Sequence, residues 1–339
     1  MLRLAVVGVG WAGRRHVEAV GELGRRLEVV RLVDNDVGFL RRQAAELGVE
    51  ECSTDYAEVL ADPEIDAVSI CTPHALHCPM ALQAAEAGKH VLVEKPMATC
   101  VEDADRMLRA ATANGVRLYV AENASYDPVA VFLRDVVQSG RYIGELVHAA
   151  CTKGFRAPDY AYPGRRAWLA RPAEGGSGTW LLHGIHSMAQ LRFIFGEVQS
   201  VYMREHKTDA YNRRELEGTM SGILTLASDV TVAVVQTCES KLYADLGGYV
   251  LHGTEGSLRA TEAGCVFFGG DGEGRALEYP EATLSSYALE MEAFADYIEK
   301  GVEGPTSGHS ERRSLAIVQA GYESAASGAP VDLEARFGG

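Results

Sequence analysis

The stretch Gly8-Val9-Gly10-Trp11-Ala12-Gly13 directly follows an apolar segment, residues 2–7. That segment has the composition of a buried strand, and a helix is expected to start within the glycine string. A second apolar strand, 27–33, ends on Asp34, about 20 residues past the last glycine. Three spaced glycines alone are a weak indication. Between a strand and a helix, with an acid at the end of the next strand, they predict a dinucleotide-binding α/β fold.

Each glycine of this string has a physical role. Gly8 makes the tight turn, Gly10 lets the backbone approach a pyrophosphate, and Gly13 lets the helix pack close to the sheet. The pyrophosphate is expected at the positive end of the helix, beside Trp11 and Ala12. The alternative is a purely structural glycine-rich turn.

Asp34 bears on the choice of cofactor. Its carboxylate would accept hydrogen bonds from the adenosine ribose hydroxyls and repel a 2′-phosphate, so the sequence favours NAD over NADP. Arg41 and Arg42 lie further along the chain and could weaken this preference.

The alternation of strands and helices continues to about residue 121. Strands are expected at 66–70, 90–93 and 117–121, and helices at 77–87 and 101–114. In such doubly wound sheets, ligands bind at the carboxyl ends of the parallel strands. The residues expected there as cofactor contacts are Gly8, Gly10, Trp11, Ala12, Gly13, Asp34, Thr72, Pro73, His77, Glu94, Lys95 and Asn123. For His77, which would touch the nicotinamide ribose, a capping or solvent-facing role is the alternative.

The segment Val91-Leu92-Val93-Glu94-Lys95-Pro96 is a strand that ends on a carboxylate, an ammonium group and a proline. Proline lacks an N–H group and therefore stops the strand ladder. Alone, this segment is also compatible with a solvated ion pair at a surface strand end. The predicted order of the sheet brings Lys95 to the cofactor edge and makes it a candidate catalytic residue.

From Pro128 the pattern changes. A helix at 128–139 is followed by several strands without intervening helices, which predicts a mainly antiparallel sheet. Strands are expected at 146–152, 198–205, 219–226, 231–237, 248–253 and 256–261, and closing helices at about 284–300 and 310–326. The chain is thus predicted to comprise an α/β domain, 1–124, and an α+β domain, 125–339.

One helix of the second half is expected to line a site. Leu181, Ile185 and Met188 follow helical spacing after a glycine run, while His183 and His186 share another face of the same helix. Both histidines are candidate catalytic and substrate-binding residues. Histidines that bond each other or backbone carbonyls are the alternative. No third ligand is evident nearby, so no metal is expected.

These motifs together resemble the Gfo/Idh/MocA oxidoreductases, the family of glucose-fructose oxidoreductase and inositol dehydrogenase. The resemblance rests on Gly8–Gly13, Cys71-Thr72-Pro73 with His77, Gly88–Pro96, Tyr126-Asp127-Pro128, Gly184-Ile185-His186, Gly253–Gly256 and Tyr322–Ala325. It implies a Rossmann domain and a second domain whose open sheet mediates oligomerisation, here in a homodimer or homotetramer. It also implies nicotinamide-dependent oxidation of a secondary hydroxyl, or reduction of a ketone, on a sugar or cyclitol.

The resemblance gives roles to two residues and leaves one gap. Lys95 would contact the reacting oxygen, with a cis bond to Pro96, and His186 would share in proton transfer. Two aspartates of the family pattern are replaced by Leu182 and Ala189. Lys95 is therefore the better candidate for general base, with partial help from His183. The expected substrate contacts are Lys95, Lys153, Tyr160, Trp168, His183 and His186.

Bulk composition narrows the partners. The 339 residues carry a net charge of −15, which argues against nucleic acid and anionic membranes and would suit a cationic substrate such as an aminosugar or aminoglycoside. The seven cysteines form no C-x-x-C pair, no apolar run approaches a membrane span, and the N-terminus lacks the features of a signal peptide. A cytoplasmic protein is expected.

The predicted function is NAD-dependent oxidation of a secondary hydroxyl to a ketone on a sugar, cyclitol or aminosugar. A ketosugar reductase of deoxysugar or aminosugar biosynthesis uses the same chemistry in reverse, and a glycosidase or lyase with transient oxidation is a further alternative. A non-enzymatic NAD-sensing regulator is the alternative from another class.

Overall fold

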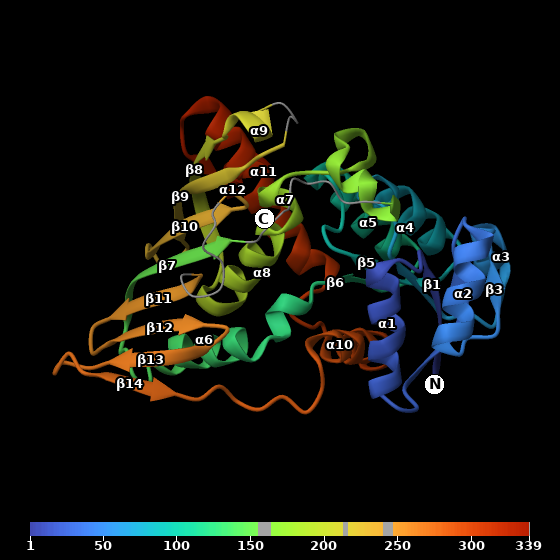
Figure 1. The fold of residues 1–339 in the computed structure, drawn as a ribbon, viewed down its shortest axis with the longest axis horizontal. Coiled ribbons are helices and arrows are strands. Elements are labelled where there is room, and N and C mark those ends of the chain that lie inside the picture. Colours follow the sequence, from blue (N-terminus) through green and yellow to red (C-terminus); the bar gives the residue numbers. More distant parts are fainter. Residues whose placement is uncertain (155–163, 213–215, 240–246, 339) are drawn as a thin grey trace. The chain divides into compact units, whose positions relative to one another are not determined.

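A computed structural model describes residues 1–154, 164–212, 216–239 and 247–338 (Figure 1). The chain forms two compact units. Unit 1 comprises Met1–Tyr126, Ala173–Gly175 and Thr283–Arg313, and unit 2 comprises Asp127–Pro172, Gly176–Ala282 and Ser314–Gly339. In the described part of the chain, no helix is both long and apolar enough to cross a membrane.

Unit 1 is built on six parallel strands. They are β1 (Leu2–Val7), β2 (Leu27–Val33), β3 (Cys52–Ser53), β4 (Ala67–Ile70), β5 (His90–Glu94) and β6 (Leu118–Ala121). Their order in the sheet is β3-β2-β1-β4-β5-β6, which is that of the doubly wound dinucleotide-binding fold. The reversal of order between β1 and β4 brings the carboxyl ends of β1, β4 and β5 together, and this is where such folds bind ligands. The predicted Rossmann fold is confirmed.

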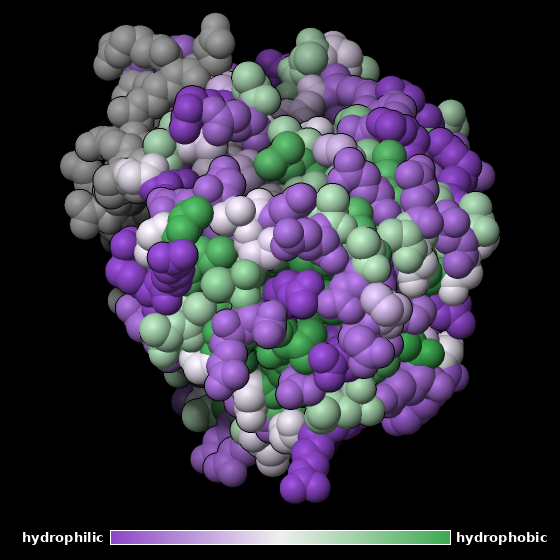
Figure 2. Space-filling model, turned by 90° about the vertical axis from the view of Figure 1, so that its right-hand side faces the viewer, coloured by the Kyte–Doolittle hydropathy of each residue, from purple (hydrophilic) through white to green (hydrophobic). Residues whose placement is uncertain are grey.

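Helices cover this sheet. They are α1 (Trp11–Glu22), α2 (Val37–Leu47), α3 (Tyr56–Ala61), α4 (His77–Glu86), α5 (Val101–Ala113) and α10 (Ser286–Lys300), with the short η1 (His74–Leu76) and η2 (Asn123–Tyr126). The sequence did not predict α2, β3 and α3. The space-filling view in Figure 2, taken from the side of α2 and α3, shows mainly hydrophilic residues with small hydrophobic groups between them.

Helix α10 joins unit 1 although it lies far beyond the predicted domain boundary at 124/125. Its buried residues Met291, Phe294 and Ala295 belong to the same apolar core as Leu4 and Tyr119. The helix therefore packs with the Rossmann core because its apolar face completes that core. The helix also carries Glu290, whose side chain is fully buried.

Unit 2 contains a nine-stranded sheet in the order β14-β13-β12-β11-β7-β10-β9-β8-β15. All pairs are antiparallel except β7 with β10, which confirms the predicted, mostly antiparallel sheet. The strands are β7 (Leu146–Gly154), β8 (Val198–His206), β9 (Thr219–Leu226), β10 (Thr231–Thr237), β11 (Gly248–Gly253), β12 (Ser257–Thr261), β13 (Gly264–Phe268), β14 (Gly274–Leu277) and β15 (Val331–Asp332). The sequence did not predict the last three, which are short.

The helical elements outside the Rossmann core are α6 (Pro128–Ser139), α7 (Thr179–Leu182), α8 (Gly184–Phe195), α9 (Asp209–Asn212) and α12 (Leu333–Phe337), with η3 (Gly164–Ala170) and η4 (Pro172–Glu174). A long helix, α11 (Gly308–Ser327), starts in unit 1 and ends in unit 2. Alternate residues of the central strands, such as Met220, Leu224, Val232 and Val234, are buried. The sheet therefore has one core-facing side.

Candidate active site

The glycine turn after β1 has the geometry that a pyrophosphate needs. Gly8 has a φ of +89°, and a Cβ added there would lie 2.5 Å from the carbonyl oxygen of Cys71. A Cβ at Gly13 would lie 2.1 Å from the carbonyl oxygen of Gly8, so the close packing of helix on turn also requires glycine. A Cβ at Gly10 would meet nothing within 4 Å. Gly8 and Gly13 thus serve the fold, and Gly10 faces open space.

The first turn of α1 can hold an anion. The helix has 12 residues, and its N-cap is Gly10, which has no side chain to accept hydrogen bonds from the N–H groups of the first turn. These groups and the helix dipole attract a phosphate. Trp11, at the first helical position, has 56% of its surface exposed and lies edge-on to Tyr287, with 6.4 Å between ring centroids. Ala12 follows it in the same turn.

Asp34 is held in place by the backbone. Its side chain is buried, Oδ2 accepts a hydrogen bond from the Val9 amide at 3.1 Å, and Oδ1 accepts one from the Asp36 amide at 3.1 Å. A carboxylate oxygen can accept more than one hydrogen bond, so the group retains acceptor capacity for a ribose diol. The glycine turn, the uncapped helix and this fixed carboxylate together fit NAD.

The turn after β4 corrects the prediction for His77. The ring is fully buried, with Nδ1 2.9 Å from the Pro96 carbonyl oxygen and Nε2 2.9 Å from the Thr72 carbonyl oxygen. Burial lowers the pKa of His77, so the neutral ring donates to one carbonyl at a time. Both nitrogens face backbone, so His77 ties the turn together and offers no nitrogen to a nicotinamide ribose.

Thr72 and Pro73 occupy this turn, next to the glycine string. The Thr72 hydroxyl oxygen is buried and has no hydrogen-bond partner among the described residues. A buried polar atom without a partner is costly, so a ligand group at this turn would satisfy it. Thr72 therefore also fits a cofactor site.

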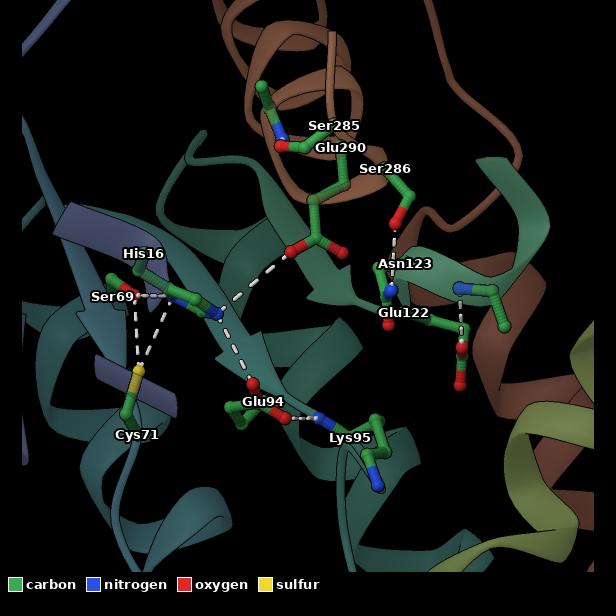
Figure 3. A network of polar contacts seen from close by, with 12 residues as sticks. His16, Ser69, Cys71, Glu94, Lys95, Glu122, Asn123, Ser285, Ser286 and Glu290 are labelled. Carbon is green, nitrogen blue, oxygen red and sulfur yellow. Dashed lines mark hydrogen bonds and ion pairs between the residues drawn. The ribbon is translucent and has the colours of Figure 1, made fainter. Parts of the chain in front are cut away.

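At the end of β5, Glu94 fixes the backbone of Lys95 (Figure 3). The Lys95 amide donates to Glu94 Oε2 at 3.1 Å, and Glu94 Oε1 lies 3.2 Å from Nε2 of His16. The Lys95–Pro96 peptide bond is cis, as expected from the family resemblance. Glu94 thus points to a backbone amide and a histidine from α1.

His16 lies at the centre of the polar network drawn in Figure 3. It is fully buried, its Nδ1 lies 2.7 Å from Ser69 Oγ, and the Cys71 sulfur lies 3.4 Å from the same nitrogen. Burial acts to lower the pKa of His16, but Cys71 and Glu94 outweigh it and hold that pKa well above its usual value. A raised pKa favours the imidazolium, which can donate from both nitrogens.

Two buried carboxyl groups, Glu122 and Glu290, and the partly buried Glu94 lie around this histidine and Lys95. Burial alone would raise the pKa of Glu94, but the hydrogen bond from His16 outweighs it and the pKa is lowered. Burial raises the pKa of Glu122 to about 8, against the opposing effect of Lys95. Burial also raises the pKa of Glu290 well above its usual value, although its Oε1 lies 3.9 Å from His16 Nε2. At pH 7 Glu94 is ionised and Glu122 is mainly protonated, while burial favours the protonated form of Glu290.

Asn123 follows β6 at the same edge of the sheet. Its Nδ2 donates to the Ser286 hydroxyl at 2.9 Å, which links η2 to the start of α10 (Figure 3). Glu122 precedes it and accepts a hydrogen bond from the Ala124 amide at 3.1 Å. The predicted contact of Asn123 with a cofactor stays a prediction.

In unit 2, the predicted single helix carrying His183 and His186 is wrong. Helix α7 ends at Leu182, His183 has φ −119° and ψ −31°, and α8 starts at Gly184. A Cβ at Gly184 would lie 2.9 Å from the Trp180 ring, so the close packing of that ring requires glycine directly after the break. The two half-buried histidine rings have centroids 6.3 Å apart and do not share one regular helix face.

The other predicted substrate contacts of unit 2 have different surroundings. Lys153 Nζ lies 5.0 Å from the centroid of the Tyr249 ring, and the Tyr249 hydroxyl donates to Gln190 of α8 at 2.7 Å. Trp168 packs, partly buried, against an apolar cluster that includes Leu169. Tyr160 lies outside the described residues. Within the described ranges, no three His, Cys, Asp or Glu side chains are grouped to hold a metal ion.

Sequence reasoning did not identify His16, Ser69 or Glu290. One signal was available, because His16 shares the buried face of α1 with Gly13 and Val20. A polar side chain on a core-facing helix stripe needs a polar partner. The partners, however, come from β4, β5 and α10, and the sequence gives no pairing among them.

Comparison with known proteins agrees with this geometry. The family model of the Gfo/Idh/MocA oxidoreductases, NAD-binding Rossmann fold, matches residues 2–122, and the model of the family's C-terminal alpha/beta domain matches residues 138–333. Inositol 2-dehydrogenase of Rhizobium meliloti is 29% identical over 96% of this chain and 97% of its own length. The 1,5-anhydro-D-fructose reductase of Ensifer adhaerens is 29% identical over 91% of each chain.

A solved structure has the same fold throughout. An oxidoreductase from Agrobacterium radiobacter, in complex with NAD+, L-tartaric acid and magnesium, superposes with a TM-score of 0.86 at 24% identity, covering 98% of this chain and 99% of that one. The two family models together cover more than half of this chain. The chain therefore belongs to the Gfo/Idh/MocA family of NAD(P)-dependent oxidoreductases, and unit 1 contains the family's NAD-binding Rossmann fold.

Proposed function

We propose that this protein is an NAD-dependent dehydrogenase that oxidises a secondary hydroxyl of a sugar-like substrate to a ketone, with Lys95 as the general base. The observation that carries the proposal is the position of Lys95. It lies at the carboxyl end of β5, on the edge of the sheet that also carries the glycine turn, and Glu94 fixes its backbone amide. Such an edge is where doubly wound folds bind ligands.

NAD, when bound by the glycine turn, α1, Asp34 and Thr72, supplies the acceptor for the two electrons of the oxidation. The protein's own residues must then orient the substrate and remove one proton. A free lysine has a pKa near 10.4 and is a poor base at neutral pH. Removal from water and nearby positive charge both disfavour the ammonium form. We propose that Lys95 takes the hydroxyl proton and, by family resemblance alone, that His186 takes part in the proton transfer.

The substrate class is argued from relatives and charge. The similar proteins named above act on a cyclitol and on an anhydrosugar, which are neutral polyols. The net charge of −15 favours adding amine-bearing analogues to the same panel. We propose a sugar, cyclitol or aminosugar, and NADH formation with a panel of all three would rank them. Higher rates with every neutral sugar than with its amine-bearing analogue would contradict the aminosugar assignment.

The role of Lys95 is tested by Lys95→Ala and Lys95→Arg. A positioned base contributes about 10²- to 10⁴-fold, so kcat should fall by that order in both variants, since arginine keeps the charge but does not release its proton. NAD affinity, measured by quenching of tryptophan fluorescence, should stay roughly constant. Lys300→Ala serves as the matched control, because Lys300 is exposed and pairs with Asp296 at 2.9 Å on α10. Full activity of the Lys95 variants would contradict the proposal.

A further inference from the structure

We propose that His16 is a positioning residue for Lys95. From α1 it binds one oxygen of Glu94, neutralises that carboxylate, and so lets the other oxygen fix the Lys95 backbone without stabilising the Lys95 ammonium group. The proposal deepens the function above, since it rests on Lys95 being the base. It explains how a lysine can follow a glutamate and still act as a base.

The geometry of His16 supports this role. The ring is fully buried, and its two nitrogens face different partners: Ser69 Oγ at 2.7 Å and Glu94 Oε1 at 3.2 Å. A histidine can donate from both nitrogens only as the imidazolium. The serine hydroxyl can accept from one nitrogen while the carboxylate accepts from the other. His16 and Glu94 then form a charge-assisted pair inside unit 1.

The pair matters because of where Glu94 lies. Its Oε2 accepts a hydrogen bond from the backbone amide of Lys95 at 3.1 Å. The carboxylate is therefore bound to the same residue that carries the ammonium group. An opposite charge within about 4–6 Å shifts a pKa by about 1–3 units toward the charged form. An unbalanced Glu94 would therefore raise the pKa of Lys95, away from the value a base needs. The imidazolium of His16 offsets that effect.

Other titratable groups face this pair. On the His16 side they are the Cys71 thiol at 3.4 Å and Glu290 of α10 at 3.9 Å. Burial favours the protonated form of Glu290, because it raises the pKa of that carboxyl well above its usual value. Glu94 is the closer partner of His16, at 3.2 Å, and its pKa is lowered, so it is the carboxylate that pairs with the imidazolium.

On the Lys95 side, the facing groups are Glu122 after β6 and two histidines of the turn after β4. Burial raises the pKa of Glu122 to about 8 and lowers the pKa values of His74 and His77. All three are thus mainly neutral at pH 7. Of the groups named here, Glu94 is ionised, and His16 lies 3.2 Å behind it.

The test reads the pKa of Lys95 directly. The chain has six lysines, so ¹³C labelling at the lysine ε-carbon gives few signals, and Lys95→Ala identifies the one that belongs to Lys95. In His16→Gln the Glu94 charge loses its counterion, and the pKa of Lys95 should rise by about one unit. The matched control is His90→Gln at the other end of β5, where the histidine accepts the Arg117 amide at 2.9 Å; it should cause no rise.

A second variant keeps the test decisive if His16→Gln does not fold. Glu94→Gln removes the carboxylate charge with little change of shape, and the pKa of His16 then falls, because one of the two groups that raise it, Cys71 and Glu94, is gone. If the pair is neutral overall in the native protein, the pKa of Lys95 should stay within a few tenths of a unit. A fall of a unit or more would mean that Glu94 acts unbalanced on Lys95, and it would overturn the proposal. So would an unchanged Lys95 pKa in folded His16→Gln.

Activity separates this inference from the proposed function. If both hold, the acid limb of the pH profile of kcat/KM moves upward in His16→Gln together with the NMR pKa. If the NMR pKa moves and Lys95→Ala stays fully active, His16 still positions Lys95 but the lysine is not the base. If Lys95→Ala is inactive and no pKa moves in folded His16→Gln, the base assignment holds and the His16 inference fails.

Discussion

Glu290 carries a carboxyl group that is fully buried and that accepts no hydrogen bond from the described residues. Its nearest charged partner is His16 Nε2, 3.9 Å from Oε1. Burial raises the pKa of Glu290 well above its ordinary value of 4.5. The folded chain therefore keeps a proton that the unfolded chain releases once the pH exceeds that value.

This proton gives a pH dependence with a definite sign. Below pH 4.5 Glu290 is protonated in the folded and in the unfolded chain, so its contribution to the free energy of unfolding does not change with pH there. As the pH rises from there to the raised folded pKa, the free energy of unfolding falls by up to about 1.4 kcal/mol per unit. Glu290→Gln has no proton to lose and should remove this loss. Urea unfolding at pH 5 and pH 8 should show the variant gaining on the native protein at pH 8.

The pKa of His16 is also raised in the folded state, so the native protein and Glu290→Gln both lose some stability as the pH rises. The comparison that counts is the difference between Glu290→Gln and the native chain at each pH. A constant difference between pH 5 and pH 8 would show that Glu290 is ionised in the folded state.

At the scale of elements, the glycine segment before α8 is held by one carboxylate. Glu217, almost fully buried, accepts hydrogen bonds from the amides of Gly178, Trp180 and Leu181 at 2.9, 3.0 and 3.2 Å, and from the Tyr322 hydroxyl at 2.7 Å. It therefore satisfies the free N–H groups at the start of α7.

Removing this carboxylate should destabilise the protein more than removing any one of its donors. Glu217→Ala leaves three buried amides and a hydroxyl without their acceptor, which should cost about 3–5 kcal/mol in the free energy of unfolding. Tyr322→Phe removes one of the four bonds and should cost about 1 kcal/mol. Chemical denaturation measures both. Equal losses in the two variants would contradict the role of Glu217 as the common acceptor.

The elements also show how far the sequence can predict this molecule. Gly8, Gly13 and Asp34 were predicted because their roles depend on backbone conformation and on short sequence distances. The break at His183 was not predicted, because Leu181, Ile185 and Met188 keep regular helical spacing across it. His16 and Glu217 were missed for a related reason: their partners lie on other elements, and residue spacing says nothing about which distant groups meet.

At the scale of the whole molecule, the large sheet of unit 2 has a side that α8 and its neighbours do not bury. One cross-strand row on that side is almost entirely apolar. It passes through Tyr202, Ile223, Ala233, Ala150, Val250, Arg259, Val266 and Ala276, each paired with the next across the sheet. Tyr202 and Ile223 have 38% and 47% of their surfaces exposed. The row is apolar without interruption from Tyr202 to Val250, and an exposed apolar row of this kind is typical of an interface.

We predict that this side of the sheet joins copies of the chain in a homodimer or homotetramer. Ile223 lies on β9, between Tyr202 of β8 and Ala233 of β10. Ile223→Lys would bury an unpaired charge in such an interface, which is strongly unfavourable. The oligomer should therefore dissociate to a monomer of 36.5 kDa, measured by light scattering after size-exclusion chromatography. Val302→Lys is the matched control, because Val302 is 56% exposed and lies in unit 1, outside this sheet. An unchanged oligomer in Ile223→Lys, or a native protein that is monomeric at micromolar concentration, would show that the apolar row does not join copies of the chain.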